Sequence, residues 1–291
     1  MKNLFLLLVP MALISGCALF PKPSDPLPAP VGPITTQGTK FLRARDPFRI
    51  IGKSIDWAVQ PKKLKDFKKL VDEDAALGIN LYFAYGSPGL GKPLFVANES
   101  GVPYSNTQNL KRDEDYWHEV DQRIMYANAF GISVVVANTF VDQGVLTRWG
   151  GSPWELLRED WKWTVVRYKD YSVFLLPLSE YNEDPKGREA ALLLLKDTTA
   201  GPISIHATKS SNQLATKMDF ITHQGWNPTL IKSDLTYGKP VIIAEDQNAA
   251  GNADKSIQRF KEAEKLGAVY IFTGYNFKWD SKMKAFLKEI Q

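Results

Sequence analysis

Two apolar runs in this 291-residue chain end in carboxylates. Residues 240–244 lead into Glu245 and Asp246, and residues 173–179 lead into Glu180. Desolvating an unpaired carboxylate costs several kcal/mol or shifts its pKa, so an acid at the end of a buried strand indicates a site. Two such strands predict a pair of carboxylates, and a pair suits acid/base or nucleophilic work on a glycosidic bond.

The elements that must position these acids alternate along the chain. From Phe48 onward, short apolar runs alternate with amphipathic stretches, which is typical of βα units around a parallel sheet. Helices are predicted at 63–77, 115–130 and 253–266, where apolar residues recur every three or four positions and a glycine follows. The eight predicted strands are 48–55, 80–85, 133–139, 173–180, 202–207, 219–223, 240–245 and 268–273.

Eight such units predict a closed (β/α)8 TIM barrel. An open doubly wound sheet is the alternative, but it should carry a glycine-rich turn after its first strand, and no such turn follows residue 55. The segments 86–112 and 140–153 follow the second and third strands. We expect these long segments to form walls above the barrel, where loops of such length are usually functional.

The N-terminal residues are predicted to lie outside the barrel. Lys2 and the apolar run 4–9 are typical of an export signal, and the run is shorter than the roughly 20 residues of a membrane span. Residues 14–17, Ile-Ser-Gly-Cys, resemble the lipobox of bacterial lipoproteins. The resemblance implies removal of residues 1–16 and lipidation of Cys17. Because Ala18 rather than Asp follows, it further implies the outer membrane of a Gram-negative cell envelope.

Composition divides the rest of the chain into a tether and one domain. Six prolines between Pro21 and Pro33 predict an extended tether over residues 17–40. Residues 41–291 have the size of a single barrel. Cys17 is the only cysteine, so the barrel is expected to contain no disulfide. The net charge of +4 is modest, and the lysines of 62–69 favour a solvated helix face over a nucleic-acid surface.

Polar and aromatic residues gather where the predicted strands end. The chemistry of a barrel lies at the C-terminal ends of its strands, and a sugar needs polar partners for its hydroxyls and aromatic rings for its C–H faces. We therefore expect a carbohydrate-binding cleft at this end. Its predicted substrate-binding residues are Asp56, Trp57, Tyr85, Asn138, Glu183, His206, His223, Trp226 and Tyr275.

The segment from Phe48 to the C-terminus resembles the retaining (β/α)8 glycoside hydrolases, whose acid/base ends the fourth strand and whose nucleophile ends the seventh. Residues 219–226, DFITHQGW, look like the sixth strand of that clan, and residues 239–245, KPVIIAE, look like the seventh. Residues 115–132 and 167–173 look more narrowly like the apiosidase-like branch of the clan.

The resemblance implies that Glu245 is the nucleophile and Glu180 the acid/base. Glu183 competes with Glu180, because residues 182–185, Asn-Glu-Asp-Pro, resemble the Asn-Glu-Pro signature of the clan but lie three residues beyond the expected strand end. Two positions depart from the pattern: Ser179 replaces an asparagine, and Asp246 stands where an aromatic residue often follows the nucleophile. In a retaining pair the carboxyl groups lie about 5–5.5 Å apart. His223 or a tyrosine is expected to hold the nucleophile charged.

Two other readings of the same residues remain open. A metal-dependent hydrolase could use His206, His223 and nearby acids, but neither a His-x-His nor a His-Glu-x-x-His motif is present, and we expect no metal and no cofactor. A non-catalytic carbohydrate-binding lipoprotein of the cell envelope would keep the barrel and lose the chemistry. The expected partners are a carbohydrate and, through Cys17, a membrane, with no nucleic acid.

Overall fold

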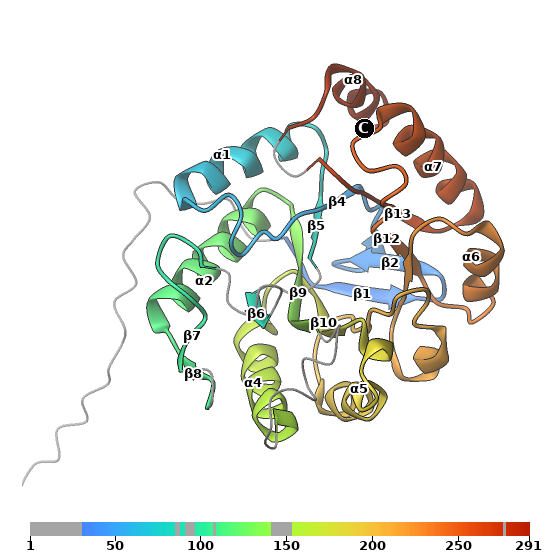
Figure 1. Ribbon diagram of the computed structural model, residues 1–291. Helices are drawn as coiled ribbons and strands as arrows, with labels where there is room; N and C mark the ends of the chain where they lie inside the picture. The colour runs from blue at the N-terminus through green and yellow to red at the C-terminus, as the bar shows by residue number, and fades with distance from the viewer. Residues whose placement is uncertain (1–30, 85–87, 91–96, 107–108, 141–152, 276–277) are drawn as a thin grey trace, which may run out of the picture.

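A parallel sheet curls around the centre of the molecule, and helices surround it (Figure 1). The computed structural model describes residues 31–84, 88–90, 97–106, 109–140, 153–275 and 278–291. Seven strands pair side by side in the order β10-β9-β5-β4-β13-β12-β11. Their bounds are β4 Gly52–Ser54, β5 Leu81–Phe83, β9 Ser133–Phe140, β10 Val173–Ser179, β11 Ile221–Gln224, β12 Val241–Ala244 and β13 Val269–Phe272.

The fifth predicted strand, 202–207, is an extended segment that fills the gap between β10 and β11. Leu175 of β10 donates its N–H to the Pro202 carbonyl at 2.9 Å, and Ser204 donates back to Leu175 at 3.0 Å. On the other side, Asp219 donates to the Ile203 carbonyl at 2.8 Å, just before β11 begins. The segment therefore completes the eighth position, and the predicted (β/α)8 barrel is confirmed.

The helices begin and end at the polar residues and glycines that the sequence provides. The side chains of Asn227, Asn252 and Asp280 accept backbone N–H bonds at the starts of α6, α7 and α8. Gly267 ends α7 with a φ of 83°, which a residue without Cβ adopts without strain. Among the described residues, no helix has the length and apolar character needed to cross a bilayer. The helices are α1 Leu64–Ala75, α2 Glu114–Ala129, α4 Pro153–Tyr168, α5 Gly187–Asp197, α6 Pro228–Leu235, α7 Ala253–Leu266 and α8 Ser281–Glu289.

Short elements decorate the connections. β6 (Pro88–Leu90) pairs with β9, and β7 (Tyr104–Asn106) pairs with β8 (Lys111–Arg112) in the segment that joins β5 to α2. This β7–β8 ribbon is tied to α4, because the Tyr104 hydroxyl and the Arg112 guanidinium both donate to the Asp160 carboxylate at 2.6 Å. Two 3₁₀ helices, Tyr181–Glu183 and Asn212–Lys217, follow β10 and precede β11.

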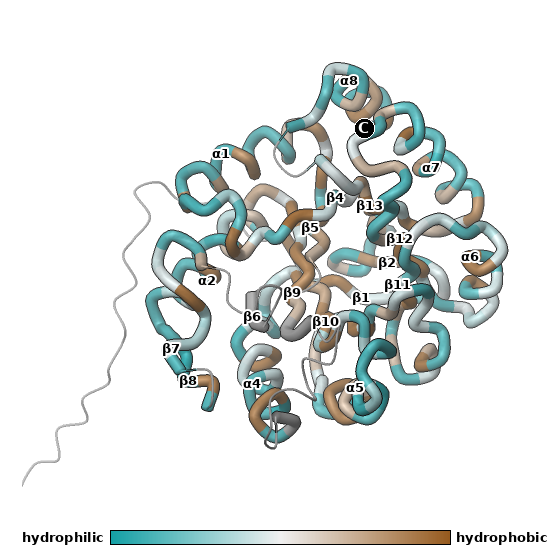
Figure 2. The backbone as a smooth tube through the Cα atoms, viewed as in Figure 1, coloured by the Kyte–Doolittle hydropathy of each residue, from teal (hydrophilic) through white to brown (hydrophobic). Residues whose placement is uncertain are grey.

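The barrel interior is filled by alternate residues of the strands. Leu81 and Phe83 of β5 and Val135 and Ala137 of β9 belong to one buried cluster, while the residues between them face the helices. Figure 2 shows β5, β9 and β10 as predominantly hydrophobic, whereas the surrounding helices mix hydrophobic and hydrophilic residues. The outward face of the sheet and the inner stripes of the helices form the larger core.

An antiparallel hairpin at the start of the described chain adds to this interior. β1 (Ile34–Gln37) pairs with β2 (Lys40–Arg43), and β3 (Asp46–Pro47) pairs with β2. Phe41 of β2 is buried and lies 5.3 Å from the ring of Phe174 and 5.6 Å from that of Phe220. The predicted boundary between residues 40 and 41 therefore falls inside a hairpin that packs with the barrel interior.

Candidate active site

Glu180 and Glu245 lie at the C-terminal end of the barrel, directly after β10 and β12, which are separated by the segment 202–207 and β11. Both have a left-handed backbone, with φ of 54° and 57°. The other non-glycine residues with positive φ in the described chain, Ala44, Arg45 and Leu110, lie in hairpin turns. A left-handed conformation costs a residue with a side chain about 1–2 kcal/mol. Such strain persists where the surroundings enforce it, and it clusters at functional sites.

The Gln224 amide joins the two carboxylates. Its Nε2 lies 2.8 Å from Oε2 of Glu245 and 3.5 Å from Oε1 of Glu180. Because both oxygens are so close to one nitrogen, they lie at most about 6.3 Å apart. Gln247 donates to the other oxygen of Glu245 at 3.1 Å. Two amides thus fix the orientation of the Glu245 carboxylate, and all three side chains are at least partly accessible to solvent.

Glu183 lies one turn beyond Glu180 in the 3₁₀ helix Tyr181–Glu183. Its backbone N–H donates to the Glu180 carbonyl at 2.9 Å, and its side chain is exposed. The Glu245 carboxylate accepts hydrogen bonds from the side chains of Gln224 and Gln247. The structure therefore brings Glu180, and not Glu183, into a shared contact with Glu245.

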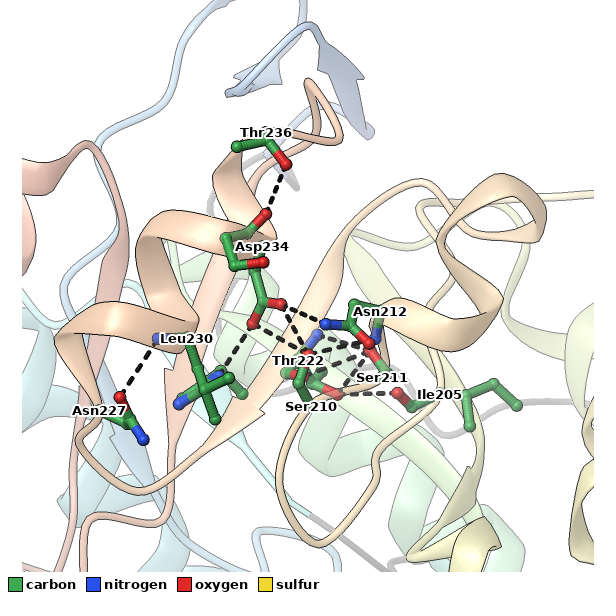
Figure 3. A network of polar contacts seen from close by, with 11 residues as sticks. Ile205, Ser210, Ser211, Asn212, Thr222, Asn227, Leu230, Asp234 and Thr236 are labelled. Atoms are coloured by element: carbon green, nitrogen blue, oxygen red, sulfur yellow. Dashed lines mark hydrogen bonds and ion pairs between the residues drawn. The ribbon is translucent and has the colours of Figure 1, made fainter.

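His223 points away from Glu245, contrary to its predicted role. Its Nδ1 lies 2.9 Å from Oδ2 of Asp234 on α6, and the imidazole is 1% exposed. Ser210 and Asn212 also donate to the Asp234 carboxylate (Figure 3), so through its contact with Asp234 the histidine belongs to a buried polar network. Successive side chains of a strand point to opposite faces, so the next residue, Gln224, faces Glu245 instead.

His206 lies in the extended segment 202–207 and is fully buried. Burial, with a smaller contribution from the nearby His223, lowers the pKa of His206 to about 3. The imidazole is therefore neutral around pH 7 and brings no positive charge to the site. Among the described residues, no group of three or more His, Cys, Asp or Glu side chains is arranged to hold a metal ion.

Two of the predicted aromatic platforms are part of the core. Trp57 is 0% exposed and donates its indole N–H to the Val135 carbonyl at 2.8 Å. Tyr275 is 3% exposed and stacks on Trp279 with ring centroids 4.9 Å apart. Neither ring presents a face to a ligand, because both belong to the larger buried core. The sugar-stacking role predicted for Trp57 and Tyr275 is not supported by this geometry.

Trp226 follows β11 and is partly exposed. The Arg259 guanidinium carbon lies 4.6 Å from the centroid of its indole, and the Tyr270 ring approaches at 6.4 Å in an edge-on geometry. Arg259 thus covers part of the indole face that a sugar would use. Trp226 is the one predicted platform whose position and exposure in the described chain still allow contact with a ligand.

The structure describes the side chain of only one of the remaining predicted residues, Asp56. Asp56 follows β4 with an exposed side chain, and its carbonyl accepts hydrogen bonds from the backbone of Val59 and Gln60. Asn138 lies within β9, but its side chain is outside the described part of the chain, as are Tyr85 and Cys17. These predictions remain predictions.

Asp246, the residue after Glu245, is fully buried behind the site. The Tyr270 hydroxyl donates to its Oδ2 at 3.3 Å, and Nε of Arg259 lies 3.8 Å from the same oxygen. Sequence reasoning missed Gln224, Gln247, Tyr270 and Arg259 as members of the site. The strand alternation around residue 223 was the available signal for Gln224.

Comparisons with known proteins agree with the fold. No protein-family model matches the sequence, and no curated protein matches it either. A family 5 glycoside hydrolase structure from Bacteroides vulgatus has a TM-score of 0.64 and 15% identity, over 83% of this chain and 62% of that one. The chain thus spans less than two thirds of that protein.

This chain aligns with nearly the whole length of two other solved structures. The endo-1,4-beta-mannanase from Rhizomucor miehei has a TM-score of 0.62 and 13% identity, over 83% of this chain and 90% of that one. The beta-glucanase SdGluc5_26A from Saccharophagus degradans has a TM-score of 0.57 and 14% identity, over 94% and 97%. A second structure of this beta-glucanase is a complex with cellotetraose. At these identities the likeness establishes the barrel fold.

Proposed function

We propose that this protein is a retaining glycoside hydrolase in which Glu245 is the nucleophile and Glu180 the acid/base. The observation that carries the proposal is the shared contact of both carboxylates with one amide nitrogen, at 2.8 and 3.5 Å. Oε2 of Glu245 and Oε1 of Glu180 thus lie within about 6.3 Å of each other, which supports the closely spaced carboxyl pair of a retaining enzyme. The pair therefore suits direct attack by one carboxylate.

The reaction proceeds in two displacements. In the first, Glu245 attacks the anomeric carbon while protonated Glu180 gives its proton to the glycosidic oxygen, so the C–O bond breaks and a covalent glycosyl-enzyme forms. In the second, ionised Glu180 takes a proton from water, the water oxygen attacks the anomeric carbon, and Glu245 leaves as a carboxylate. Gln224 and Gln247 hold the oxygens of Glu245 in place for both steps.

The proposed substrate is a polysaccharide or oligosaccharide. Support comes from the fold neighbours named above, a mannanase and a beta-glucanase, and from the position of the carboxylate pair at the C-terminal end of the barrel. The likeness of residues 115–132 and 167–173 to the apiosidase-like branch is a further prediction within this class.

Release of sugar from a panel of aryl glycosides and polysaccharides tests the proposal. We expect turnover of at least one substrate by the wild type, none by Glu245→Gln, and near-normal turnover by Glu183→Gln, because Glu183 is exposed one turn away. Binding of a polysaccharide without release of sugar would instead identify a non-catalytic carbohydrate-binding barrel. Activity that a chelator abolishes would favour a metal-dependent hydrolase.

We further propose that Cys17 anchors the protein to the cell envelope, in the outer membrane. The lipobox-like residues 14–17 and the proline-rich segment that follows support this proposal. The full chain expressed in a Gram-negative host should partition into the detergent phase and incorporate labelled fatty acid, and Cys17→Ser should do neither. Equal partitioning of the two proteins would contradict the anchor.

A further inference from the structure

Asp246 follows Glu245 directly in the sequence, and its side chain, an acid, is fully buried. Glu245 ends the strand segment in a left-handed conformation, with φ 57°, and Asp246 turns its side chain toward α7 and β13. Its carboxylate lies against the Tyr270 hydroxyl at 3.3 Å and the Arg259 guanidinium at 3.8 Å. These two groups compensate for the desolvation of Oδ2 only in part, since Nε of Arg259 and the other oxygen, Oδ1, are buried without a hydrogen bond.

The partners of Asp246 are themselves fixed. Tyr270 belongs to β13, is buried, and meets the ring of Phe272 at 5.6 Å. Arg259 lies on α7 between the Trp226 indole at 4.6 Å and the Glu262 carboxylate at 3.3 Å. Asp246 is therefore tied at once to the helix that follows it and to the next strand of the barrel.

The backbone after Glu245 is held as well. Gln247 donates its N–H to the Glu245 carbonyl at 2.9 Å, and Ala249 donates to the Asp246 carbonyl at 3.0 Å. Gly274, which follows β13, packs so closely that a Cβ atom there would lie 2.5 Å from the Gly251 nitrogen. These contacts support the residues that follow Glu245 but do not themselves fix its φ, which is left to the side-chain contacts of Asp246.

We propose that Asp246 is a positioning residue for Glu245: its contacts with Arg259 and Tyr270 hold Glu245 in the left-handed conformation that aims the carboxylate at Gln224 and Glu180. The role of Glu245 as nucleophile rests on the proposed function, whereas the backbone claim does not. This role explains why an acid occupies a position where the resembled clan often has an aromatic residue. An aromatic side chain would fill the space but could not form the ion pair with α7.

The backbone claim is tested without activity by comparing Glu245→Gly with Glu245→Ala. Both remove the carboxylate, but only glycine accepts a left-handed backbone without strain, so Glu245→Gly should have the higher Tm by about 2–4 °C. With Asp246→Ala added to each, the turn can relax, and the difference should disappear or reverse. Arg259→Met, at a partly exposed side chain, serves the same purpose if Asp246→Ala fails to fold. If the Tm difference between Glu245→Gly and Glu245→Ala stayed the same after Asp246→Ala or Arg259→Met was added, the proposal would be overturned.

The kinetic arm uses Asp246→Asn and a matched control. Asp160 is also a buried aspartate beside a tyrosine and an arginine, here the hydrogen-bond donors Tyr104 and Arg112, but it lies on α4 outside the barrel. Asp246→Asn should lower kcat about 10- to 100-fold with KM within about 3-fold, and Asp160→Asn should leave both nearly unchanged. Equal kcat in Asp246→Asn and wild type would refute positioning. A wild type inactive on every sugar would refute the proposed function, while the Tm comparison would still decide the role of Asp246.

Discussion

The two ends of the barrel differ in how their residues are used: one end is packed with apolar rings, and the other carries the carboxyl pair. At the N-terminal end, the β1–β2 hairpin buries Phe41 against Phe174 and Phe220, with ring centroids 5.3 to 5.7 Å apart in edge-on contacts. At the C-terminal end, Glu180 and Glu245 stand half-buried on left-handed backbones around the Gln224 amide. Apolar packing stabilises one end, whereas the other end retains backbone strain where two carboxyl groups are brought together.

The difference shows how a barrel separates its stability from its chemistry. Residues at the N-terminal end touch nothing that would react, so their substitution should change the free energy of unfolding and leave kcat per folded molecule alone. Residues at the C-terminal end carry strain and charge, so their substitution should change kcat and leave stability equal or higher. Glu245 and Gln224 are expected to affect mainly kcat, and Phe41 mainly stability.

Glu245→Gln should give the largest effect. Without the carboxylate no glycosyl-enzyme can form, so we expect kcat to fall at least about 10⁴-fold, equal to about 5 kcal/mol at 1.36 kcal/mol per tenfold. The Tm should stay within a few degrees, because the amide preserves the shape of the side chain. Steady-state kinetics and thermal unfolding measure both. A large drop in Tm would place Glu245 on the structural side.

Phe41→Ala should show the reverse pattern. Removing the buried ring leaves a cavity beside Phe174 and Phe220, and we expect a loss of about 3–5 kcal/mol in the free energy of unfolding. Phe41→Leu, which keeps most of the volume, should lose less than about 1.5 kcal/mol. Denaturant unfolding and kcat per folded molecule check the two arms. A change in kcat with Phe41→Leu would break the separation between the two ends.

His206 should make stability depend on pH. Its folded pKa of about 3 lies below the unfolded value of about 6.5, so between these values the unfolded chain binds a proton that the folded protein does not. Stability is therefore complete above pH 6.5 and falls as the pH decreases, by about 2 kcal/mol between pH 7 and pH 5.

Denaturant unfolding at both pH values measures the effect of His206. His206→Gln should lack this part of the pH dependence, and His118→Gln, which changes a histidine on α2, should retain it. An identical pH dependence in wild type and His206→Gln would show that the buried imidazole is not responsible.

Gln224→Met should give a smaller effect than the changes at Glu245, Phe41 and His206. The substitution keeps the length of the side chain but removes the donor that joins Glu180 and Glu245, so we expect kcat to fall about 10-fold with little change in Tm. Gln247→Met removes a donor to Glu245 alone and should cost less. Measured kcat values for the two variants show which of the two amides contributes more to the reaction. A larger loss with Gln247→Met would shift the central contact away from Gln224.

The sequence predicted the barrel because the signals for it are local. Apolar runs and amphipathic stretches located the paired strands and the helices 63–77, 115–130 and 253–266 to within a few residues, and Gly78, Gly131 and Gly267 all adopt the left-handed φ expected after a helix. The hairpin around residue 41 was missed. It spans Ile34–Arg43, its strands are short, and its only strong signals are the Gly38-Thr39 turn and the few apolar residues Ile34, Phe41 and Leu42.

The site was predicted in part, because strand ends can be located from sequence but the facing of individual side chains cannot. Glu180 and Glu245 were placed at strand ends, and the structure brings them together. His223 and Gln224 are adjacent polar residues, and only the tertiary contacts show that the histidine faces Asp234 on α6 and the glutamine faces Glu245. The role of Trp57 was predicted wrongly for the same reason, since the sequence alone does not distinguish a tryptophan of the core from one that stacks on a sugar.

Trapping of a covalent intermediate tests the central claim most directly. The wild type is incubated with a 2-deoxy-2-fluoro glycosyl fluoride of a sugar that it hydrolyses, and the digested protein is analysed by mass spectrometry. We predict a mass increase of one fluorosugar on the peptide that contains Glu245, and no adduct in Glu245→Gln. Hydrolysis of the parent substrate with inversion at the anomeric carbon, or an adduct on a different residue, would contradict the assignment.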